Sequence, residues 1–504
     1  MDILDTEDKN AVKDHMIHPH LIASRLIWMF IALILFAAWL CFRSSGRTIA
    51  ESGASALMIT CIAIGIWIQA AIVPGWDWTA MFVPVAAAGL AVALIWRLRH
   101  RAIQTWCNVG QFVRSYPFPV ATAVVAIGFR GIWAIWGSPP GFPVWPLAEI
   151  TNPPPDTIAP LLGSQSRLWM QTCHSLAGNM AYGAIGLSTF ALSRRHAWAP
   201  ASLTATLVVL GMPRLAIPLG ADAELITAAA ALFVLMTLYR IIEEPRIDDL
   251  LLLIPGLICT WSTHPMGWIL PSLMTFLTLL LIGRRHGLVH MTHLVRHHRW
   301  RVVSAGGLSV MMLPLWIRSV NFWGQNPHSI IRYNTDGLSG AAANLMRYVL
   351  QMAQLSSSAR SWIRPISLWW HGLLEGIYQS IAPLLGGNSG AISSFNLSTG
   401  TGFGPLSLLL VLPAVGYSLV RGPRRLRAIA ISIGWYWFLL VLIPVWQPDS
   451  IQLLTPLMAI SGFMAAFFLP PWRFSRTGQF LLNLLCLLSL CYSFISITAP
   501  FLQY

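Results

Sequence analysis

Residues 226–246, ITAAAALFVLMTLYRIIEEPR, decide the fold of this chain. The run from Ile226 to Tyr239 carries no charged side chain, and Arg240 and Arg246 follow it. A membrane-spanning helix needs about 20 mostly apolar residues, and short cytoplasmic loops collect arginine and lysine. The stretch therefore predicts one membrane span whose C-terminal end faces the cytoplasm.

The same pattern recurs along the chain. Of its 504 residues, 56% are hydrophobic and 10% are charged, which is more apolar surface than a soluble fold can bury. We therefore expect an all-α, polytopic integral membrane protein with about 14 transmembrane helices. The transmembrane helix expected near Ala201 is weakened by Pro213, Arg214 and Pro218. The apolar runs begin near Leu26, Ala54, Ala80, Val120, Leu176, Ala201, Ile226, Leu250, Trp268, Val302, Pro405, Ala428, Ile451 and Phe480.

The basic loops set the expected orientation. They follow every second span, which predicts that both termini lie outside. The formal net charge of +14 then reflects a belt of cytoplasmic arginines that faces anionic lipid headgroups. We expect no nucleic-acid partner. Two lysines among 32 basic residues are typical of a GC-rich bacterial genome, so we expect the bacterial inner membrane. The loops are Arg43/Arg47, 97–101, Arg194/Arg195, Arg240/Arg246, 284–301, 421–427 and Arg473/Arg476.

Two long segments fall on the outward side, at 137–174 and 319–402. The first is proline-rich, and the second contains two amphipathic stretches, Leu338 to about Leu355 and Trp362 to Leu385, of the kind that lie in the membrane interface. We expect four parts: a tail with three spans (1–116), seven spans (117–318), the long outward segment (319–402) and four C-terminal spans (403–504).

Carboxylates near a membrane are costly and mark candidate sites. Asp77 lies in a short outward turn between tryptophans, and Glu149 and Asp156 lie in the proline-rich segment. Asp222 and Glu224, two residues apart, would suit a divalent metal such as Mg²⁺ or Mn²⁺, or would cap the helix that follows. For each acid, a solvated loop end is the alternative.

Basic and aromatic residues in the late outward segment are the other candidates. Arg332 and Arg347 oppose the positive-inside trend and would suit a phosphate or a headgroup; Trp323 and His328 lie in the same segment. On the cytoplasmic side, His286, His290, His293 and His297 recur at helical spacing among arginines. Without an acid or cysteine beside them, an interfacial basic helix is favoured over zinc binding. The seven cysteines form no CxxC pair and predict no metal site.

Several patches resemble the GT-C superfamily of membrane glycosyltransferases, which use polyprenyl-phosphate sugars at the outer face of the membrane. The resemblance runs from about Val120 to the C-terminus, and the order of the patches carries it. A seven-span module, followed by a long outward loop, also matches the span count from Val120. The patches are 152–155 through 162–164, 168–195, 326–327 with 344–347, 404–406, 446–449 and 453–457.

The resemblance implies sugar transfer from a polyprenyl-phosphate donor at the periplasmic face. The family usually carries its catalytic aspartate early in the first outward loop, and residues 137–144 contain no acid, so Glu149 or Asp156 would be the base. In an alternative alignment, which matches residues 74–77 to a Trp-Asp motif of related bacterial members, Asp77 would be the base. Asp222 and Glu224 would orient a metal or the acceptor, and Arg332 or Arg347 would neutralise the lipid phosphate. The alternatives are a transporter or flippase, and a non-catalytic subunit of an envelope polysaccharide system.

Overall fold

The computed structural model describes most of the chain, and all its regular elements are helices, so the all-α prediction is confirmed. No strand occurs among the described residues, which are 31–43, 46–72, 77–136, 164–216, 222–263, 267–307, 310, 334, 336–355, 364–385, 395, 397, 402–444, 446, 448–469 and 475–498. The first half contains Ile31–Arg43, α2 (Ile49–Ile72), α3 (Asp77–Ser115), α4 (Pro117–Trp136), α6 (Ser164–Ser193), α7 (Ala199–Leu210), α8 (Pro213–Ala216), α9 (Asp222–Glu243) and α10 (Ile247–Thr263). The second half contains α11 (Ile269–His286), α12 (Leu288–His297), α14 (Gly337–Met352), α15 (Arg364–Ile381), η2 (Ala382–Leu385), α17 (Pro405–Arg421), α18 (Arg424–Leu442), η3 (Pro448–Leu454), α19 (Thr455–Gly462), α20 (Met464–Phe468) and α21 (Arg476–Thr498).

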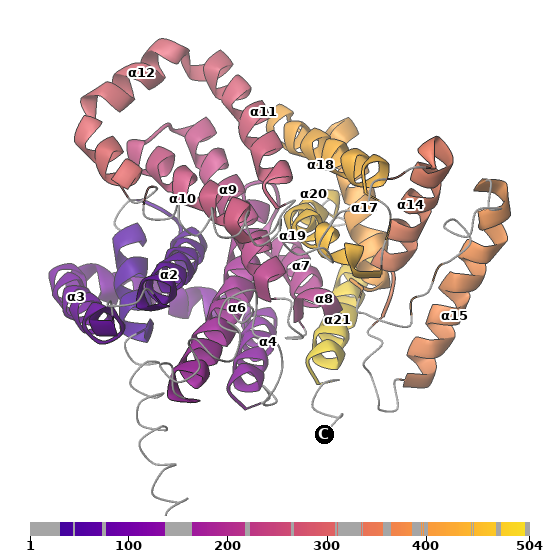
Figure 1. Ribbon diagram of the computed structural model, residues 1–504, viewed down its shortest axis with the longest axis horizontal. Coiled ribbons are helices and arrows are strands. Elements are labelled where there is room, and N and C mark those ends of the chain that lie inside the picture. Colours follow the sequence, from indigo (N-terminus) through magenta and orange to yellow (C-terminus); the bar gives the residue numbers. More distant parts are fainter. Residues whose placement is uncertain are drawn as a thin grey trace, which may run out of the picture.

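Helix α9, which includes residues 226–243, forms the centre of the bundle. It is buried from Glu224 to Tyr239, and α2, α6, α10, α11 and α19 pack around it (Figure 1). Small residues let the neighbours approach closely. Residues 228–231 are four fully buried alanines, and a Cβ added at Gly256 of α10 would lie 2.9 Å from Val234. An apolar helix covered on all sides needs other helices, rather than lipid, as its partners.

Three described helices are long and apolar enough to cross a membrane: Glu224–Glu243, Arg424–Leu442 and Arg476–Ser496. A fourth arises if Asn108–Ser115 and Pro119–Arg130, which meet at a bend of 106°, count as one span. Five shorter helices are also apolar: Ile31–Arg43, Ile49–Ile64, Ala199–Leu210, Pro405–Arg421 and Ile451–Gly462. These apolar helices are compatible with a membrane protein, and the count of about fourteen spans stays a prediction.

Proline and glycine break the helices near two predicted spans. Near Ala201, α7 ends at Leu210 and α8 starts at Pro213, as expected from the proline and arginine there. Near Ile451, the chain passes from η3 into α19 and α20, with a break at Phe463. The two broken segments pack closely, because a Cβ at Gly462 of α19 would lie 2.0 Å from Val209 of α7.

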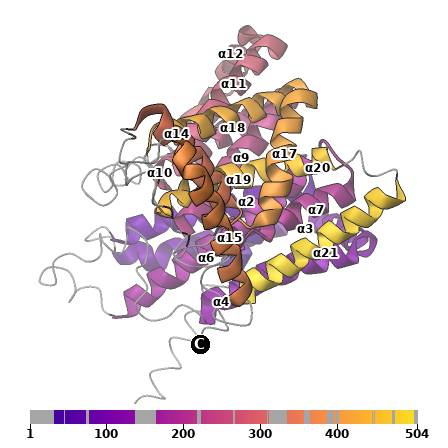
Figure 2. The ribbon, with the colours of Figure 1, turned by 90° about the vertical axis from the view of Figure 1, so that its right-hand side faces the viewer.

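The long outward segment contains two helices where the amphipathic stretches predict them. The stretches 338–355 and 362–385 correspond to α14 and to α15 with η2. Helix α14 packs against α17 and α18, and α15 packs against α14, so that both lie beside the bundle (Figures 1 and 2). Along the exposed side of α15, Ile366, Leu368 and Trp369 face outward. Helices are thus present in this segment, and their interfacial position remains a prediction.

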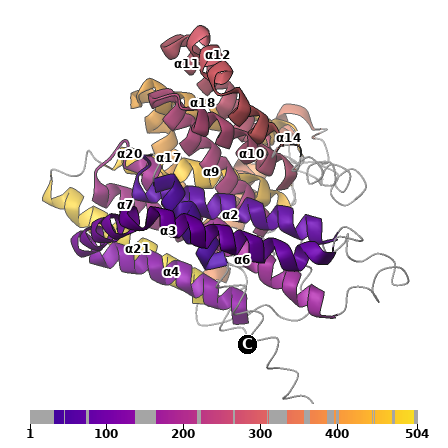
Figure 3. The same ribbon diagram turned by 90° about the vertical axis from the view of Figure 1, so that its left-hand side faces the viewer.

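On another side, α2, α4 and α7 pack against α6, while α21 packs against α4 and α7 (Figure 3). Helix α12 stands clear of the bundle in the same view. Gly287, at φ +77°, separates α11 from α12, so the four histidines spaced as one helical row do not share a helix. His286 belongs to α11 and bonds the carbonyl of Ile242 through Nε2 at 2.9 Å. The expectation of a single histidine face was wrong because glycine permits this left-handed break.

Candidate functional site

Each end of α9 carries a cluster of buried polar groups. Glu224 lies at one end and Arg240 at the other, sixteen residues on, which is roughly 24 Å along a helix. We name these clusters the outer pole and the inner pole, after the orientation that the basic loops predict. Each pole gathers side chains from helices that are distant in the sequence.

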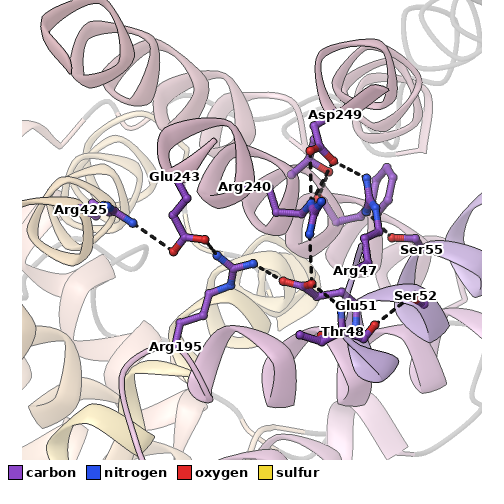
Figure 4. Close-up of polar contacts among 12 residues, drawn as sticks. Arg47, Thr48, Glu51, Ser52, Ser55, Arg195, Arg240, Glu243, Asp249 and Arg425 are labelled. Carbon is purple, nitrogen blue, oxygen red and sulfur yellow. Dashed lines mark hydrogen bonds and ion pairs between the residues drawn. The ribbon is translucent and has the colours of Figure 1, made fainter. Parts of the chain in front are cut away.

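The inner pole is a network of ion pairs (Figure 4). Arg240 donates to Asp249 at 3.1 Å and to Glu51 at 3.2 Å, and Arg47 also pairs with Asp249. Arg195 bridges Glu51 and Glu243, and Arg425 reaches Glu243 at 3.1 Å. The network joins α2, the turn after α6, α9, α10 and α18.

The charged groups of this network are largely buried, so each must keep its partner for the fold to be stable. The side chains of Arg47, Glu51 and Asp249 are at most 2% exposed. In the ion pairs of the described residues, four guanidinium groups face three carboxylates, which leaves one net positive charge. A buried charge that loses its partner costs several kcal/mol. The inner pole therefore fixes how these helices meet, and it contains no side chain that the sequence marked as a site residue.

His196 adds a neutral polar contact beside this network. Its Nε2 lies 2.9 Å from the hydroxyl of Tyr239, and its ring packs against Phe463 and Phe467. Burial, followed by the charge of Arg195, lowers the pKa of His196 to about 4. The imidazole is consequently neutral at physiological pH and belongs to the packing of the inner pole.

The outer pole is built on a buried carboxylate. Arg214 of α8 donates to Glu224 through Nε at 3.1 Å and through Nη2 at 2.6 Å. The hydroxyl of Thr455, at the start of α19, donates to Glu224 at 3.1 Å. This bidentate geometry is the strong form of an arginine–carboxylate pair. Glu224 is therefore the residue that holds α8, α9 and α19 together at this end.

A second feature of the outer pole is an arginine between aromatic rings. Arg347 of α14 is 3% exposed, and its guanidinium carbon lies 5.1 Å from the ring centre of Tyr378 and 5.2 Å from that of Trp446. Phe395 packs against both rings, at 4.7 and 5.3 Å. We call these four residues the arginine cage. Burial lowers the pKa of Arg347, although Tyr378 acts in the opposite direction.

Neighbours on the same face of α14 position the cage. Asn344 accepts a hydrogen bond from the backbone of Trp446 at 3.2 Å and donates to the carbonyl of Pro444 at 2.9 Å. Gln351 accepts from Nε1 of Trp446 at 3.0 Å. Asn344 and Gln351 stand three residues before and four residues after Arg347, so all three share one helix face. The cage is thus fixed by α14 and by the segment after α18.

The end of the long outward segment connects the cage with Glu224. The backbone of Phe403 donates to the carbonyl of Met352 at 3.2 Å, next to the last turn of α14. One residue earlier, the carbonyl of Gly402 accepts from the backbone of Arg214 at 3.0 Å. A Cβ at Gly402 would lie 2.5 Å from two carbonyl oxygens, so only glycine fits there. The cage and the Arg214–Glu224 pair therefore belong to one end of the molecule.

Two of the residues that the sequence marked have described side chains, Glu224 and Arg347, and each lies in its own cluster of contacts. Asp77 and Asp222 are the first residues of α3 and α9, where only the backbone is described. The remaining candidates lie outside the described residues: Glu149, Asp156, Trp323, His328 and Arg332.

Sequence reasoning missed the partners of these residues. Trp446 and Tyr378 form the cage, and Thr455 completes the hydrogen bonds of Glu224. Arg214 carried a usable signal, since an arginine between prolines on the outward side opposes the positive-inside trend. No spacing in the sequence connects Trp446 with Arg347, because the rest of the long outward segment and helices α17 and α18 lie between them.

The observed contacts also test whether Asp222 and Glu224 fit a divalent metal. Mg²⁺ and Mn²⁺ take oxygen ligands with free lone pairs. Both oxygens of Glu224 instead accept hydrogen bonds from Arg214, whose charge would repel a cation. Among the described residues, no three histidine, cysteine or acidic side chains converge on one point. Glu224 therefore does not fit a metal site.

Comparison with known proteins adds no further assignment. No protein-family model matches this sequence, and no curated protein or solved structure is significantly similar to it.

Proposed function

We propose that this protein is a membrane glycosyltransferase of the GT-C kind, which moves a sugar from a polyprenyl-phosphate donor to an acceptor at the outer face of the membrane. One observation carries the proposal. The arginine cage stands on an amphipathic helix beside the bundle, and Gly402 ties that region to the buried carboxylate at the start of α9. A lipid-phosphate enzyme needs a cation close to acidic groups, where the phosphate leaves.

The two poles of α9 support the orientation. The inner pole gathers four arginines, as expected of a cytoplasmic end, and the outer pole lies roughly 24 Å away, comparable to the bilayer core of about 30 Å. We extend the proposal to the full topology of about fourteen spans with both termini outside. Cysteine accessibility at introduced sites in α12 and α14 would test it, because the two helices should be labelled from opposite sides.

The proposed roles divide the chemistry among three groups. A carboxylate, Glu149 or Asp156, takes the proton from the acceptor hydroxyl as its oxygen attacks the anomeric carbon. The bond from that carbon to the phosphate oxygen breaks, and the lipid phosphate leaves with the electron pair. Arg347, assisted by Arg332, stabilises the departing phosphate. Trp323 and His328 would contact the substrate.

Glu224 takes a positioning role in this scheme, because its oxygens are already engaged. Asp222, two residues earlier at the start of the same helix, is then the acid that would orient the acceptor. In the alternative alignment with the GT-C family, Asp77 is the base. In this scheme Asp222 and Asp77 would touch the substrate, whereas Glu224 would act only through its pair with Arg214.

The test is sugar transfer by the purified protein in proteoliposomes. Radiolabelled polyprenyl-phosphate hexoses and pentoses would be supplied with membrane lipid extract, and labelled product would be measured for the wild type and for Glu149→Gln, Asp156→Asn and Asp77→Asn. General-base removal should reduce transfer by about 100-fold or more in one of the three. Undiminished transfer in all three would exclude the scheme.

One observation favours a second candidate, a transporter of lipid-linked or envelope glycan. Arg130 of α4 is 1% exposed within an apolar helix, donates to Oδ1 of Asn179 at 2.8 Å, and lies 5.3 Å from the ring centre of Tyr182. Ionisable residues inside membrane helices often line substrate pathways. A transporter would move labelled lipid-linked sugar across the bilayer without forming product, and Arg130→Gln would abolish that movement.

A further inference from the structure

Residues 284–301 form an excursion from the bundle that we call the arch. It comprises the last turn of α11, helix α12 and the start of the helical residues 299–307, and α12 stands clear of the other helices in Figures 1 and 3. Both ends of the arch are held at the corner between α9 and α10. His286 bonds the carbonyl of Ile242 at 2.9 Å, and Arg301 pairs with Asp248 at 3.0 Å.

Helix α11 indicates the depth at which the arch begins. Phe276 and Leu280 are 60% and 51% exposed. Arg284 comes four residues after Leu280, so all three residues lie on one face of α11. An exposed apolar stripe on a membrane protein faces lipid tails, and an arginine at its end extends into the headgroup layer. The arch therefore leaves the bundle at the level of the inner headgroups.

The arch combines positive charge with exposed apolar side chains. No aspartate or glutamate occurs between residues 250 and 335, while the arch itself carries five arginines. Val289 and Trp300 are 83% and 74% exposed, and Val303 just beyond the arch is 63% exposed. Exposed apolar side chains among arginines suit the boundary between acyl chains and headgroups. Bulk water would not suit these apolar groups.

We propose that the arch docks on anionic phospholipid headgroups of the inner leaflet. Charge complementarity selects that partner, because each arginine near an anionic surface contributes about 1 kcal/mol to binding. Continuity with the lipid-facing stripe of α11 places the arch where such headgroups lie. The proposal does not depend on the glycosyltransferase assignment, since it concerns the opposite face of the membrane.

Hydrogen exchange of the full-length protein in nanodiscs would test the proposal. Exchange of residues 287–300 would be compared between discs of neutral phosphatidylcholine and discs containing about 30% phosphatidylglycerol. The variants are Arg296→Gln/Arg299→Gln, the charge-keeping Arg296→Lys/Arg299→Lys, and a matched control, Arg421→Gln/Arg424→Gln. Both glutamine pairs replace exposed basic-loop arginines.

We expect anionic lipid to slow exchange in the wild type, in the lysine variant and in the matched control. Removing two arginines from the arch should reduce that protection by about 30-fold, which corresponds to about 2 kcal/mol. Equal exchange in the two kinds of disc would overturn the proposal, whatever else the arch binds. The same loss in the matched control would also overturn it, because the basic belt as a whole would then be responsible.

Discussion

The substitution Glu51→Gln tests whether the inner pole holds the bundle together. Glu51 is 2% exposed, pairs with Arg195, lies 3.2 Å from Arg240, and accepts a hydrogen bond from the backbone of Thr48 at 2.9 Å. Glutamine keeps the size and one acceptor oxygen but removes the charge. The network then holds two uncompensated positive charges in place of one.

The expected cost follows from that imbalance. Breaking a buried ion pair by removing one partner typically costs 3–5 kcal/mol, and the retained acceptor favours the lower end, about 3 kcal/mol. With an unfolding entropy of about 2.1 cal/mol/K per residue, a chain of this length loses about 1 °C in Tm per kcal/mol. We therefore expect Tm to fall by roughly 3 °C.

The assay is tryptophan-fluorescence thermal unfolding of the purified protein in one detergent at one scan rate. Glu244→Gln is the matched control, because Glu244 pairs with Arg246 on the surface, where both side chains are well exposed. Surface pairs contribute little to stability, so the control should unfold with the wild type. Equal Tm values for the two variants would refute the assignment of the inner pole as a structural lock.

Three further predictions concern single positions. Because His196 has a pKa of about 4 in the folded protein and about 6.5 when unfolded, stability should be full above pH 6.5 and fall by on the order of 3 kcal/mol between pH 6.5 and 4. His196→Gln should flatten that decline in Tm measured against pH. Gly462→Ala should lower Tm by about 1–3 °C, because its Cβ would meet Val209 at 2.0 Å, whereas Gly434→Ala, with open space around it, should leave Tm unchanged or higher. Thr455→Val removes a hydrogen bond to a buried carboxylate and should cost about 1.5–3 kcal/mol, seen as a lower Tm; an unchanged value would contradict the contact.

The all-α architecture could be predicted from the sequence, because long apolar runs and amphipathic periods are local signals of helices. The two amphipathic helices α14 and α15 were predicted nearly to their ends, and the span expected to be weakened near Ala201 is divided between α7 and α8. The histidine row failed because periodicity alone ignores a glycine that ends a helix, as Gly287 does.

The site was less predictable, because its contacts join segments far apart in the chain. Glu224 could be singled out as an acid near the membrane, but its pairing with Arg214 required α8 to fold back beside α9. The arginine cage brings Arg347 next to Trp446, ninety-nine residues later, through hydrogen bonds of Asn344 and Gln351. Composition and spacing carry no information about such contacts.

Binding of polyprenyl phosphate to the arginine cage tests the central claim most directly. Native mass spectrometry of the purified protein, titrated with polyprenyl phosphate, would compare the wild type with Arg347→Gln and with Arg360→Gln, an arginine of the same outward segment to which no role is assigned. A charged hydrogen bond contributes about 1.5–3 kcal/mol, so Arg347→Gln should weaken binding about tenfold or more while Arg360→Gln binds like the wild type. Equal affinity of all three proteins for the lipid phosphate would contradict the account.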